Sequence, residues 1–294
     1  LADDAFTNTT NMPQDVIYTV VPVSAGGCEG QPFTITVTVK DPIVISGDPT
    51  DYNGFEISCF GANDGEIRPT ISGGKLPTDD PTYVYSWIGP NGYTANTKDI
   101  DNLAPGIYTL TVGDGVNICQ QTRSFEITEP DPIVVNGDLS DYNGNNISCA
   151  GEEDGSIDLI VTGGTGVGTY VYSWTARNGG VIPAGQENAA QLTGIPAGEY
   201  EVTVTDLNNC TPVVETYVLD EPDPINLLEV DDTRVNVLCY GEPTGSITVT
   251  ASGGTPGYIY ALRGLTYAGD SVNTQTAVVP NNLHTYDQLL AGNY

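Results

Sequence analysis

Six cysteines are the residues of this chain whose type and spacing point most clearly to covalent chemistry. They stand at regular intervals in an acidic sequence, and no two of them form a Cys-x-x-Cys pair. Zinc sites use close cysteine or histidine pairs, and the chain has a single histidine, His284. Structural disulfides made in an oxidising compartment are therefore favoured over a metal site.

Acidic turns offer a second chemistry, the binding of calcium through six to eight oxygen ligands. The candidate ligands lie in two similar stretches and are Asp51, Asn53, Asp64, Asp141, Asn143 and Asp154. Asn-Gly and Asp-Gly pairs also form turns without any ion. The corresponding stretch after residue 230 lacks the Asp-Tyr-Asn-Gly element, so a fold-required ion is disfavoured. We therefore expect no cofactor, with calcium as the alternative.

Catalytic constellations are not evident in the sequence. A Ser-His-Asp triad would need His284, which lies in a stretch without a counterpart elsewhere in the chain. Gly73-Gly74 lacks the following Lys-Ser/Thr and the helix of a phosphate-binding loop. We expect that the protein is not an enzyme and that it has no catalytic residue.

An aromatic run, Tyr83-Val84-Tyr85-Ser86-Trp87, suits either a sugar-stacking platform or a buried core. Its aromatic side chains alternate onto one face of a strand. The equivalent run at residues 258–262 has a leucine, Leu262, in place of tryptophan. Because leucine suits a core and would spoil a stacking platform, core packing is favoured.

These candidates belong to a repeat of about 90 residues. Cys149 follows Cys59 by 90 positions, and Cys239 follows Cys149 by 90. Three further motifs recur in the same order: Ser72-Gly73-Gly74 at 162–164 and 252–254, the aromatic run at 170–174 and 258–262, and Pro105-Gly106-Ile107-Tyr108 at 197–200 and 291–294. A fixed period of this size predicts one domain with its own core per repeat.

The predicted domains span residues 41–130, 131–222 and 223–294, the last of them truncated, after residues 1–40, which look like the tail of an upstream domain. Glu129-Pro130-Asp131-Pro132 and Glu221-Pro222-Asp223-Pro224 join them. Proline fixes φ and restricts its predecessor, so these joints should be short and stiff. We expect the domains end to end in an elongated array, with little contact beyond the joints.

Each repeat is predicted to be an all-β, immunoglobulin-like Greek-key sandwich. Seven short strands are expected in the first repeat, at residues 43–46, 55–60, 66–72, 83–88, 97–100, 107–112 and 123–128. Tyr108 and Tyr200 follow a glycine, as in the tyrosine corner of such domains, where the hydroxyl bonds to nearby backbone. We expect both tyrosines, Trp87 and Trp174 to be buried.

The repeat register predicts the disulfides Cys59–Cys119 and Cys149–Cys210, with Cys28 and Cys239 unpaired within residues 1–294. Each bond would close a loop of about 60 residues, contributing about 4 kcal/mol in the chain-entropy model.

The charge of the chain excludes two classes of partner. Asp+Glu number 38 against 8 Lys+Arg, a formal net charge of -30. Such a chain is repelled by nucleic acid and by anionic membrane surfaces. No window approaches 18 apolar residues, so we expect no membrane insertion.

The motif set, from Cys59-Phe60-Gly61 through the aromatic run to Cys119, resembles the SprB repeat over residues 41–294. Residues 1–40 resemble the end of a PKD-like or related immunoglobulin-like domain. SprB repeats belong to giant surface adhesins of Bacteroidota that are exported by the type IX secretion system, and the namesake serves gliding motility. The resemblance implies a secreted, extracellular cell-surface protein that meets the type IX machinery during export.

The function expected from these observations is that of a structural stalk or spacer in a large adhesin, linked to surface adhesion or gliding. Its partners would be the neighbouring repeats of the same chain. The alternative is an array of carbohydrate-binding modules with surface glycans as partners. Binding arrays should repeat an exposed cluster in each unit, whereas the residues that recur here are mostly core, turn and cysteine positions.

Overall fold

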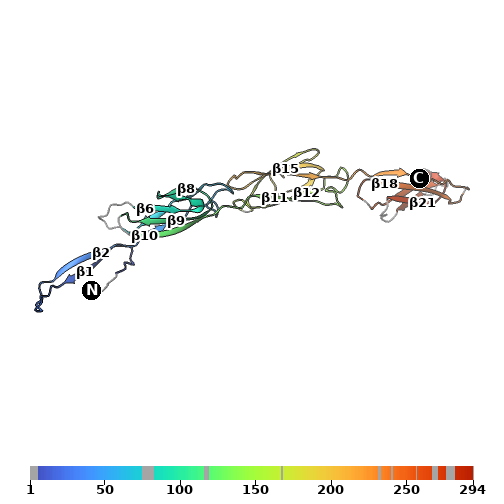
Figure 1. The fold of residues 1–294 in the computed structure, drawn as a ribbon. Helices are drawn as coiled ribbons and strands as arrows, with labels where there is room; N and C mark the ends of the chain where they lie inside the picture. Colours follow the sequence, from blue (N-terminus) through green and yellow to red (C-terminus); the bar gives the residue numbers. More distant parts are fainter. Residues whose placement is uncertain are drawn as a thin grey trace. The chain divides into compact units, whose positions relative to one another are not determined.

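The computed structural model describes residues 6–74, 83–115, 119–166, 168–230, 233–239, 241–255, 257–266, 271–275 and 282–293. The chain divides into two compact units. One unit consists of Leu1–Ile133, Thr162–Thr169 and Asp206–Thr211, and the other of Val134–Val161, Tyr170–Thr205 and Pro212–Tyr294. The regular secondary structure of both is almost wholly β-strand (Figure 1).

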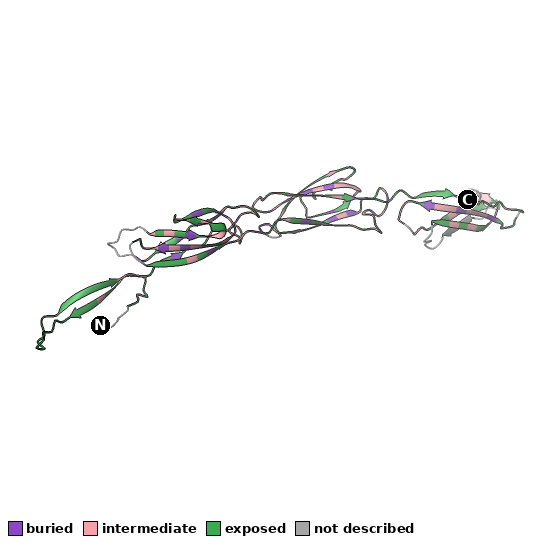
Figure 2. Ribbon diagram, in the orientation of Figure 1, coloured by how far each residue is buried: buried purple, intermediate pink, exposed green. Residues whose placement is uncertain are grey.

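The N-terminal segment is a two-stranded antiparallel hairpin of β1 (Gln14–Val20) and β2 (Phe33–Val39). Tyr18 stands opposite Ile35 in this hairpin. Nearly all its residues are exposed, in contrast to the repeats, where buried positions recur along the strands (Figure 2). Valine, isoleucine and threonine in alternation explain why the segment is a strand pair.

The first repeat forms three small antiparallel sheets. Their strands are β3 (Val44–Ser46) with β5 (Thr70–Ser72), β4 (Gly65–Ile67) with β8 (Ile100–Leu103), and β10 (Gln120–Ile127), β9 (Gly106–Gly113), β6 (Val84–Ile88) and β7 (Thr94–Ala95) in that order. A single 3-10 turn, η1 (Pro90–Gly92), connects β6 and β7.

Alternation in β9 supplies much of the core of this repeat. Tyr108, Leu110 and Val112 are each at most 2% exposed, while the residues between them face outward. Trp87 from β6 is fully buried, and its ring lies 5.7 Å from that of Phe125 on β10. The inward face predicted from period-two alternation is confirmed.

Three strand predictions for this repeat differ from the structure. Residues 55–60 form turns, because the N–H groups of Glu56 and Ile57 both bond to the carbonyl of Thr128 and so leave no continuous ladder. The strand expected at 66–72 is interrupted at Pro69, which lacks an N–H to donate. The strand expected at 97–100 is displaced, since β7 ends before it and β8 begins only at its last residue, Ile100.

The second repeat has the same plan in two three-stranded sheets. Their strands are β11 (Val134–Leu139), β12 (Gly155–Thr162) and β14 (Gln191–Ile195), and β13 (Val171–Arg177), β15 (Gly198–Thr205) and β16 (Val213–Leu219). Trp174, Tyr200, Val202 and Val204 are buried here as their counterparts are in the first repeat.

The tyrosine corners are confirmed in both repeats. The hydroxyl of Tyr108 donates to the carbonyl of Ala104 at 3.0 Å, and that of Tyr200 donates to Pro196 at 2.8 Å. In each case the acceptor lies four residues upstream, before the glycine that opens the strand. A buried phenol is thus satisfied within its own turn.

The third repeat again pairs two sheets. Their strands are β17 (Asn226–Glu229), β18 (Gly245–Ser252) and β21 (Leu283–Leu289), and β20 (Ser271–Gln275), β19 (Ala261–Thr266) and β22 (Gly292–Asn293). Tyr294, the predicted counterpart of Tyr108, lies outside the described residues.

The predicted fold class, tandem immunoglobulin-like β-sandwich domains, is confirmed. The domain boundaries and the end-to-end arrangement stay predictions. The expectation of little contact beyond the joints was wrong, because Asp206–Thr211 of the second repeat packs with the first repeat in one compact unit. Within the described residues, no helix is long and apolar enough to cross a membrane.

Candidate functional site

A disulfide between Cys59 and Cys210 is the strongest candidate for a functional site. Their sulfur atoms are 2.09 Å apart and their Cα atoms 5.5 Å apart, although the two cysteines are separated by 151 positions in the sequence. The bond therefore ties the first repeat to the loop between β15 and β16 of the second. Both cysteines lie in the same compact unit.

The predicted pairs Cys59–Cys119 and Cys149–Cys210 were wrong. Cys119 and Cys149 are exposed free thiols, as are Cys28 and Cys239. Only Cys59 and Cys210 are bonded among the described cysteines, and they are bonded to each other.

Strand length explains why the in-repeat pairs do not form. Cys119 immediately precedes β10, whereas Cys59 lies near Thr128, which follows the last residue of that strand and accepts the N–H of Ile57 at 3.2 Å. The eight residues of β10 span about 27 Å. A disulfide needs Cα atoms about 4.4–6.8 Å apart. The two cysteines of one repeat therefore lie at opposite ends of their domain.

The second repeat has the same geometry. Cys210 precedes β16, and Asp220, just after that strand, accepts the N–H groups of Asn146 and Ile147 at 2.9 and 3.1 Å. Cys149 follows Ile147 by two positions and so lies at the far end of β16 from Cys210. The same separation excludes the pair Cys149–Cys210.

Cys59 is held in a turn that two carboxylates anchor. Asp64 accepts the backbone N–H of Ser58 at 3.1 Å and also the hydroxyl of Ser58. Glu129, from the joint, accepts the N–H of Gly61 at 2.8 Å, and Gly61 has a left-handed φ of 76°. The Ala62 N–H closes the turn on the carbonyl of Cys59 at 3.0 Å.

Cys210 is held from the other side by Asp206, which is 1% exposed. One carboxylate oxygen of Asp206 accepts the N–H and the hydroxyl of Thr165, both at 2.9 Å, and the other accepts the N–H of Cys210 at 3.0 Å. Burial raises the pKa of Asp206, but the backbone donors of Thr165 and Cys210 outweigh it and lower the pKa below its ordinary value. The ionised carboxylate thus fixes the loop that carries the cysteine.

Polar contacts surround the disulfide. The side-chain amide of Asn208 donates to the carbonyl of Ser58 at 3.1 Å and lies 3.5 Å from the amide of Asn53. Cys210 is only 8% exposed, while Cys59 is half-buried. Limited access for an attacking thiolate slows the reduction of such a bond. The arrangement is that of a structural cross-link.

The calcium candidates in the Asp-Tyr-Asn-Gly elements serve their own turns. Asp51 accepts the N–H of Gly54 at 2.6 Å, and Asp141 accepts that of Gly144 at 2.7 Å. Asn53 and Asn143 occupy left-handed positions with φ of 58° and 59°. Asparagine tolerates this conformation in turns without a metal.

The remaining calcium candidates, Asp64 and Asp154, face the cysteine turns. Asp154 accepts the N–H of Ser148 at 3.1 Å, as Asp64 does from Ser58. Over the part of the chain that the structure describes, no three His, Cys, Asp or Glu side chains come together as a metal site would need. The absence of a cofactor stays an expectation.

The aromatic run packs into the core, as expected. Trp87 donates its indole N–H to Thr97 at 3.0 Å, and Trp174 donates to Ala189 at 2.9 Å. Tyr83 bonds through its hydroxyl to Gly73 at 2.7 Å and packs against the core with Tyr85.

His284, the histidine that a Ser-His-Asp triad would need, packs against two tyrosines. The centroid of its ring lies 5.4 Å from that of Tyr260 and 4.6 Å from that of Tyr286.

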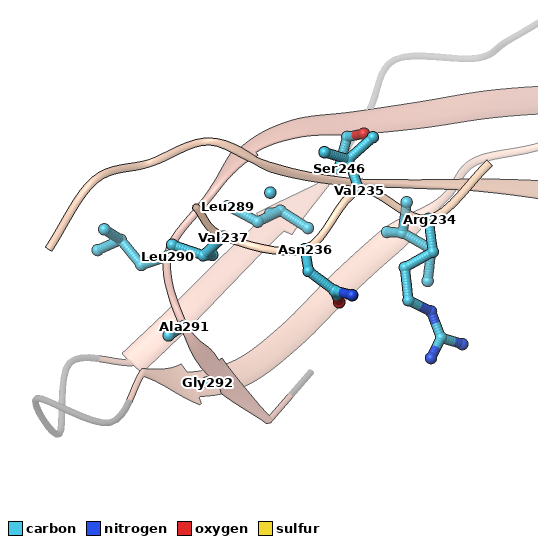
Figure 3. Close-up of a pocket in the computed structure, with 11 residues that line it drawn as sticks. Arg234, Val235, Asn236, Val237, Ser246, Leu289, Leu290, Ala291 and Gly292 are labelled. Atoms are coloured by element: carbon cyan, nitrogen blue, oxygen red, sulfur yellow. The ribbon is translucent and has the colours of Figure 1, made fainter. Parts of the chain in front are cut away.

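A cavity of about 540 Å³ opens in the third repeat, lined in part by Val235, Val237 and Leu289 (Figure 3). Gly245 also lines it. In the first two repeats the equivalent glycines, Gly65 and Gly155, lie against Ile127 and Leu219 of the last strand. The cavity therefore occupies the place of a core contact that the other repeats make, and its position does not indicate a ligand.

Tandem immunoglobulin-like sandwiches with recurring sequence motifs define a repeat protein. The SprB repeat family model matches residues 56–92, 142–179 and 232–266, and the PKD-like domain model matches residues 2–42. The chain carries three SprB repeats behind a PKD-like segment, which confirms the resemblance drawn from the motifs.

Three solved structures are similar to this chain at low sequence identity. Three N-terminal domains of the Hoc outer capsid protein of bacteriophage RB49 match at 12% identity and a TM-score of 0.43, covering 84% of this chain and 86% of that one. Domains A168–A170 of titin match at 11% identity and a TM-score of 0.28, covering 85% and 89%. A Salmonella alpha-2-macroglobulin matches at 10% identity and 0.21, covering 95% and 26%. None of the curated proteins matches the chain.

Proposed function

We propose that this segment is a structural stalk or spacer that carries tension in a large adhesin secreted to the cell surface, and that it has no catalytic activity. The observation that carries the proposal is the disulfide Cys59–Cys210 with its separation of 151 positions. A disulfide between residues so far apart in the sequence gives tension a covalent path that bypasses the residues between them.

Tension applied to the two ends of the chain can pass directly from Cys59 to Cys210. Residues 60–209 then lie inside a covalent loop and cannot be pulled out while the bond is intact. At about 3.3–3.6 Å per extended residue, the loop withholds on the order of 500 Å of chain. Most of the first two repeats would therefore be shielded from forced unfolding.

The same bond also stabilises the folded state at rest. In the chain-entropy model, a loop of this length removes about 5 kcal/mol of unfolded-state entropy. This is a large fraction of the 5–15 kcal/mol by which typical domains are stable. A passive spacer that must resist proteases benefits from that margin.

Surface charge suits a crowded array of such stalks. The net charge of -30 repels neighbouring copies over about 8 Å at physiological salt. The match to the SprB repeat family supports two further parts of the proposal. These are export through the type IX secretion machinery and a link to gliding or surface adhesion in Bacteroidota. The adhesive function would then be carried mainly by other parts of the protein.

Single-molecule pulling on the full chain tests this proposal. The oxidised chain should release on the order of 500 Å less contour length than the chain reduced with dithiothreitol. The variant Cys59→Ser should behave like the reduced chain, whereas the matched control Cys119→Ser, which removes an exposed free thiol, should behave like the oxidised one. Equal release from oxidised and reduced chains would contradict the proposal.

The carbohydrate-binding alternative receives no support from the aromatic residues. Trp87 and Trp174 are at most 5% exposed, so their rings offer no open face to a sugar. We therefore favour the stalk.

A further inference from the structure

The free thiol of Cys149 lies in a turn that repeats the turn of Cys59. Ser148 donates its N–H to Asp154 at 3.1 Å, the same distance as between Ser58 and Asp64. Cys149 accepts the N–H of Glu152 at 3.1 Å, as Cys59 accepts that of Ala62.

The joint holds both turns in the same way. Glu221 accepts the N–H of Gly151 at 2.6 Å, as Glu129 accepts that of Gly61 at 2.8 Å. Gly151 also has a left-handed φ of 80°. The turn of Cys149 therefore has the same backbone hydrogen bonds and the same two carboxylate contacts as the turn of Cys59, which is bonded. Cys149 is thus held in the conformation in which Cys59 forms its disulfide.

The third repeat presents Cys239 in a related turn. Thr244 replaces the aspartate and accepts the N–H of Leu238 at 2.9 Å, while Cys239 accepts the N–H of Glu242 at 3.2 Å. Cys239 is an exposed thiol. The first cysteine of every repeat thus lies in a turn of similar local geometry, and one of the three is bonded.

The position of Cys210, the second cysteine of its repeat, also has equivalents elsewhere in the chain. Cys119 follows β9 as Cys210 follows β15, and it accepts the N–H of Asp114 at 3.3 Å. Cys28 lies between β1 and β2, where it accepts the N–H of Ser24 at 2.9 Å and donates its own N–H to the Ser24 hydroxyl at 3.1 Å. The second of these bonds takes the place of the one between Cys210 and Asp206.

We propose that the first cysteine of each repeat bonds to the second cysteine of the following repeat. Cys149 would then bond to the second cysteine of a repeat placed directly after its own, and Cys239 would do the same one repeat later. Cys119, a second cysteine, would bond to the first cysteine of a preceding domain. The inference goes beyond the proposed function and does not depend on it, since it concerns which thiols meet.

The chemistry is an ordinary two-electron oxidation. Two thiols lose two protons and two electrons and form one sulfur–sulfur bond. The oxidant is a disulfide, either that of a thiol oxidoreductase or oxidised glutathione, which is reduced to two thiols.

Consecutive bonds of this kind would interlock. Cys149 lies inside the loop closed by Cys59 and Cys210. A bond from Cys149 to the next repeat therefore begins within the first loop and ends outside it. Each cross-link would then overlap the next one, leaving no joint between repeats without a covalent bridge.

The test is a full chain in which a second copy of residues 131–222 is inserted between Pro222 and Asp223. The insertion preserves the Glu-Pro-Asp-Pro joint at both ends. Serine replaces Cys59, Cys210 of the first copy and Cys149 of the second copy, so that Cys149 of the first copy and Cys210 of the second are the pair under test. The chain is refolded in a glutathione redox buffer, alkylated and mapped by mass spectrometry.

We expect a disulfide between these two cysteines, and alkylation of Cys28, Cys119 and Cys239. The matched control keeps Cys149 in the second copy and replaces it in the first, which leaves only an in-repeat pair, and should give no disulfide. Alkylation of both tested cysteines in the first chain, or a disulfide in the control, would overturn the proposal.

A second extended chain keeps every cysteine and so avoids the serine substitutions. It has two cysteines more than the six of the natural chain. We expect four alkylated thiols, the same number as in the natural chain. Formation of the Cys59–Cys210 bond serves as an internal reference for correct folding. If that bond forms and six thiols are alkylated, the inserted repeat has formed no second disulfide and the proposal is overturned.

Discussion

The carboxylate of Asp206 accepts the backbone N–H of Cys210 at 3.0 Å and so links a buried charge to the position of a disulfide. The same side chain receives two further hydrogen bonds from Thr165. The loop between β15 and β16 is thus fixed from within its own repeat before its cysteine meets Cys59.

Replacing Asp206 by alanine should destabilise the chain by about 1–3 kcal/mol, because buried donors of Thr165 and Cys210 lose their acceptor. It should also slow formation of the Cys59–Cys210 bond. Urea unfolding and the rate of thiol loss on refolding measure the two effects. Asp158→Asn, on the exposed face of β12, is the control and should change neither. Unchanged stability for Asp206→Ala would contradict the role assigned to this carboxylate.

Acid should weaken the second repeat through the same residue. The folded pKa of Asp206 is lowered, so its contribution to the free energy of unfolding is complete above its unfolded pKa of about 3.9 and is lost as the pH falls through the folded value. Unfolding measured at pH 7 and near pH 3 should show a larger loss for the natural chain than for Asp206→Asn. Parallel losses in the two proteins would refute this assignment.

The tyrosine corners should contribute measurably to stability. Tyr200→Phe keeps the ring but removes both the hydrogen bond to Pro196 and the one that the hydroxyl accepts from the N–H of Val181, and should cost about 1–3 kcal/mol. Tyr108→Phe removes the bond to Ala104 in the first repeat and should cost about 0.5–1.5 kcal/mol. Thermal unfolding is the measurement, and Tyr18→Phe, on the exposed hairpin, is the control. A cost no larger than that of the control would show that the corner is not a stabilising feature.

The folded chain should not bind glycans with a dissociation constant below about 1 mM. Its repeated aromatic side chains Trp87 and Trp174 are in the core and cannot stack on a sugar. A glycan array probed with the full chain is the measurement. Reproducible binding to one glycan, abolished by changing one repeated surface residue, would favour the carbohydrate-binding alternative over the stalk.

The features of this protein that depend on local chemistry could be predicted from the order of its residues. A strand exposes alternate residues to opposite faces, so the inward set of β9 could be predicted from Tyr108, Leu110 and Val112. A tyrosine after a turn glycine reaches a carbonyl four residues away, so both corners could be predicted as well. The motif spacing was also sufficient to recognise the SprB repeats.

The disulfide pairing could not be predicted from the cysteine spacing and follows from the folded domains. The spacing of Cys59, Cys119, Cys149 and Cys210 shows which positions are equivalent, but not which end of a domain each occupies. One signal was present in the sequence: Cys119 lies before the last strand predicted at residues 123–128, and the joint follows that strand. That order places Cys119 a full strand away from the next repeat.

The position of Cys59 could not be obtained in this way, because residues 55–60 looked like a strand of their own. Whether their N–H groups would pair with a neighbouring strand or with the single carbonyl of Thr128 depends on a contact between segments about 70 positions apart. Side-chain alternation and turn composition are properties of adjacent residues, whereas the direction in which distant strands run is a property of the whole domain. For that reason the sequence yielded the sandwich and its core, and only the folded chain revealed the bond between repeats.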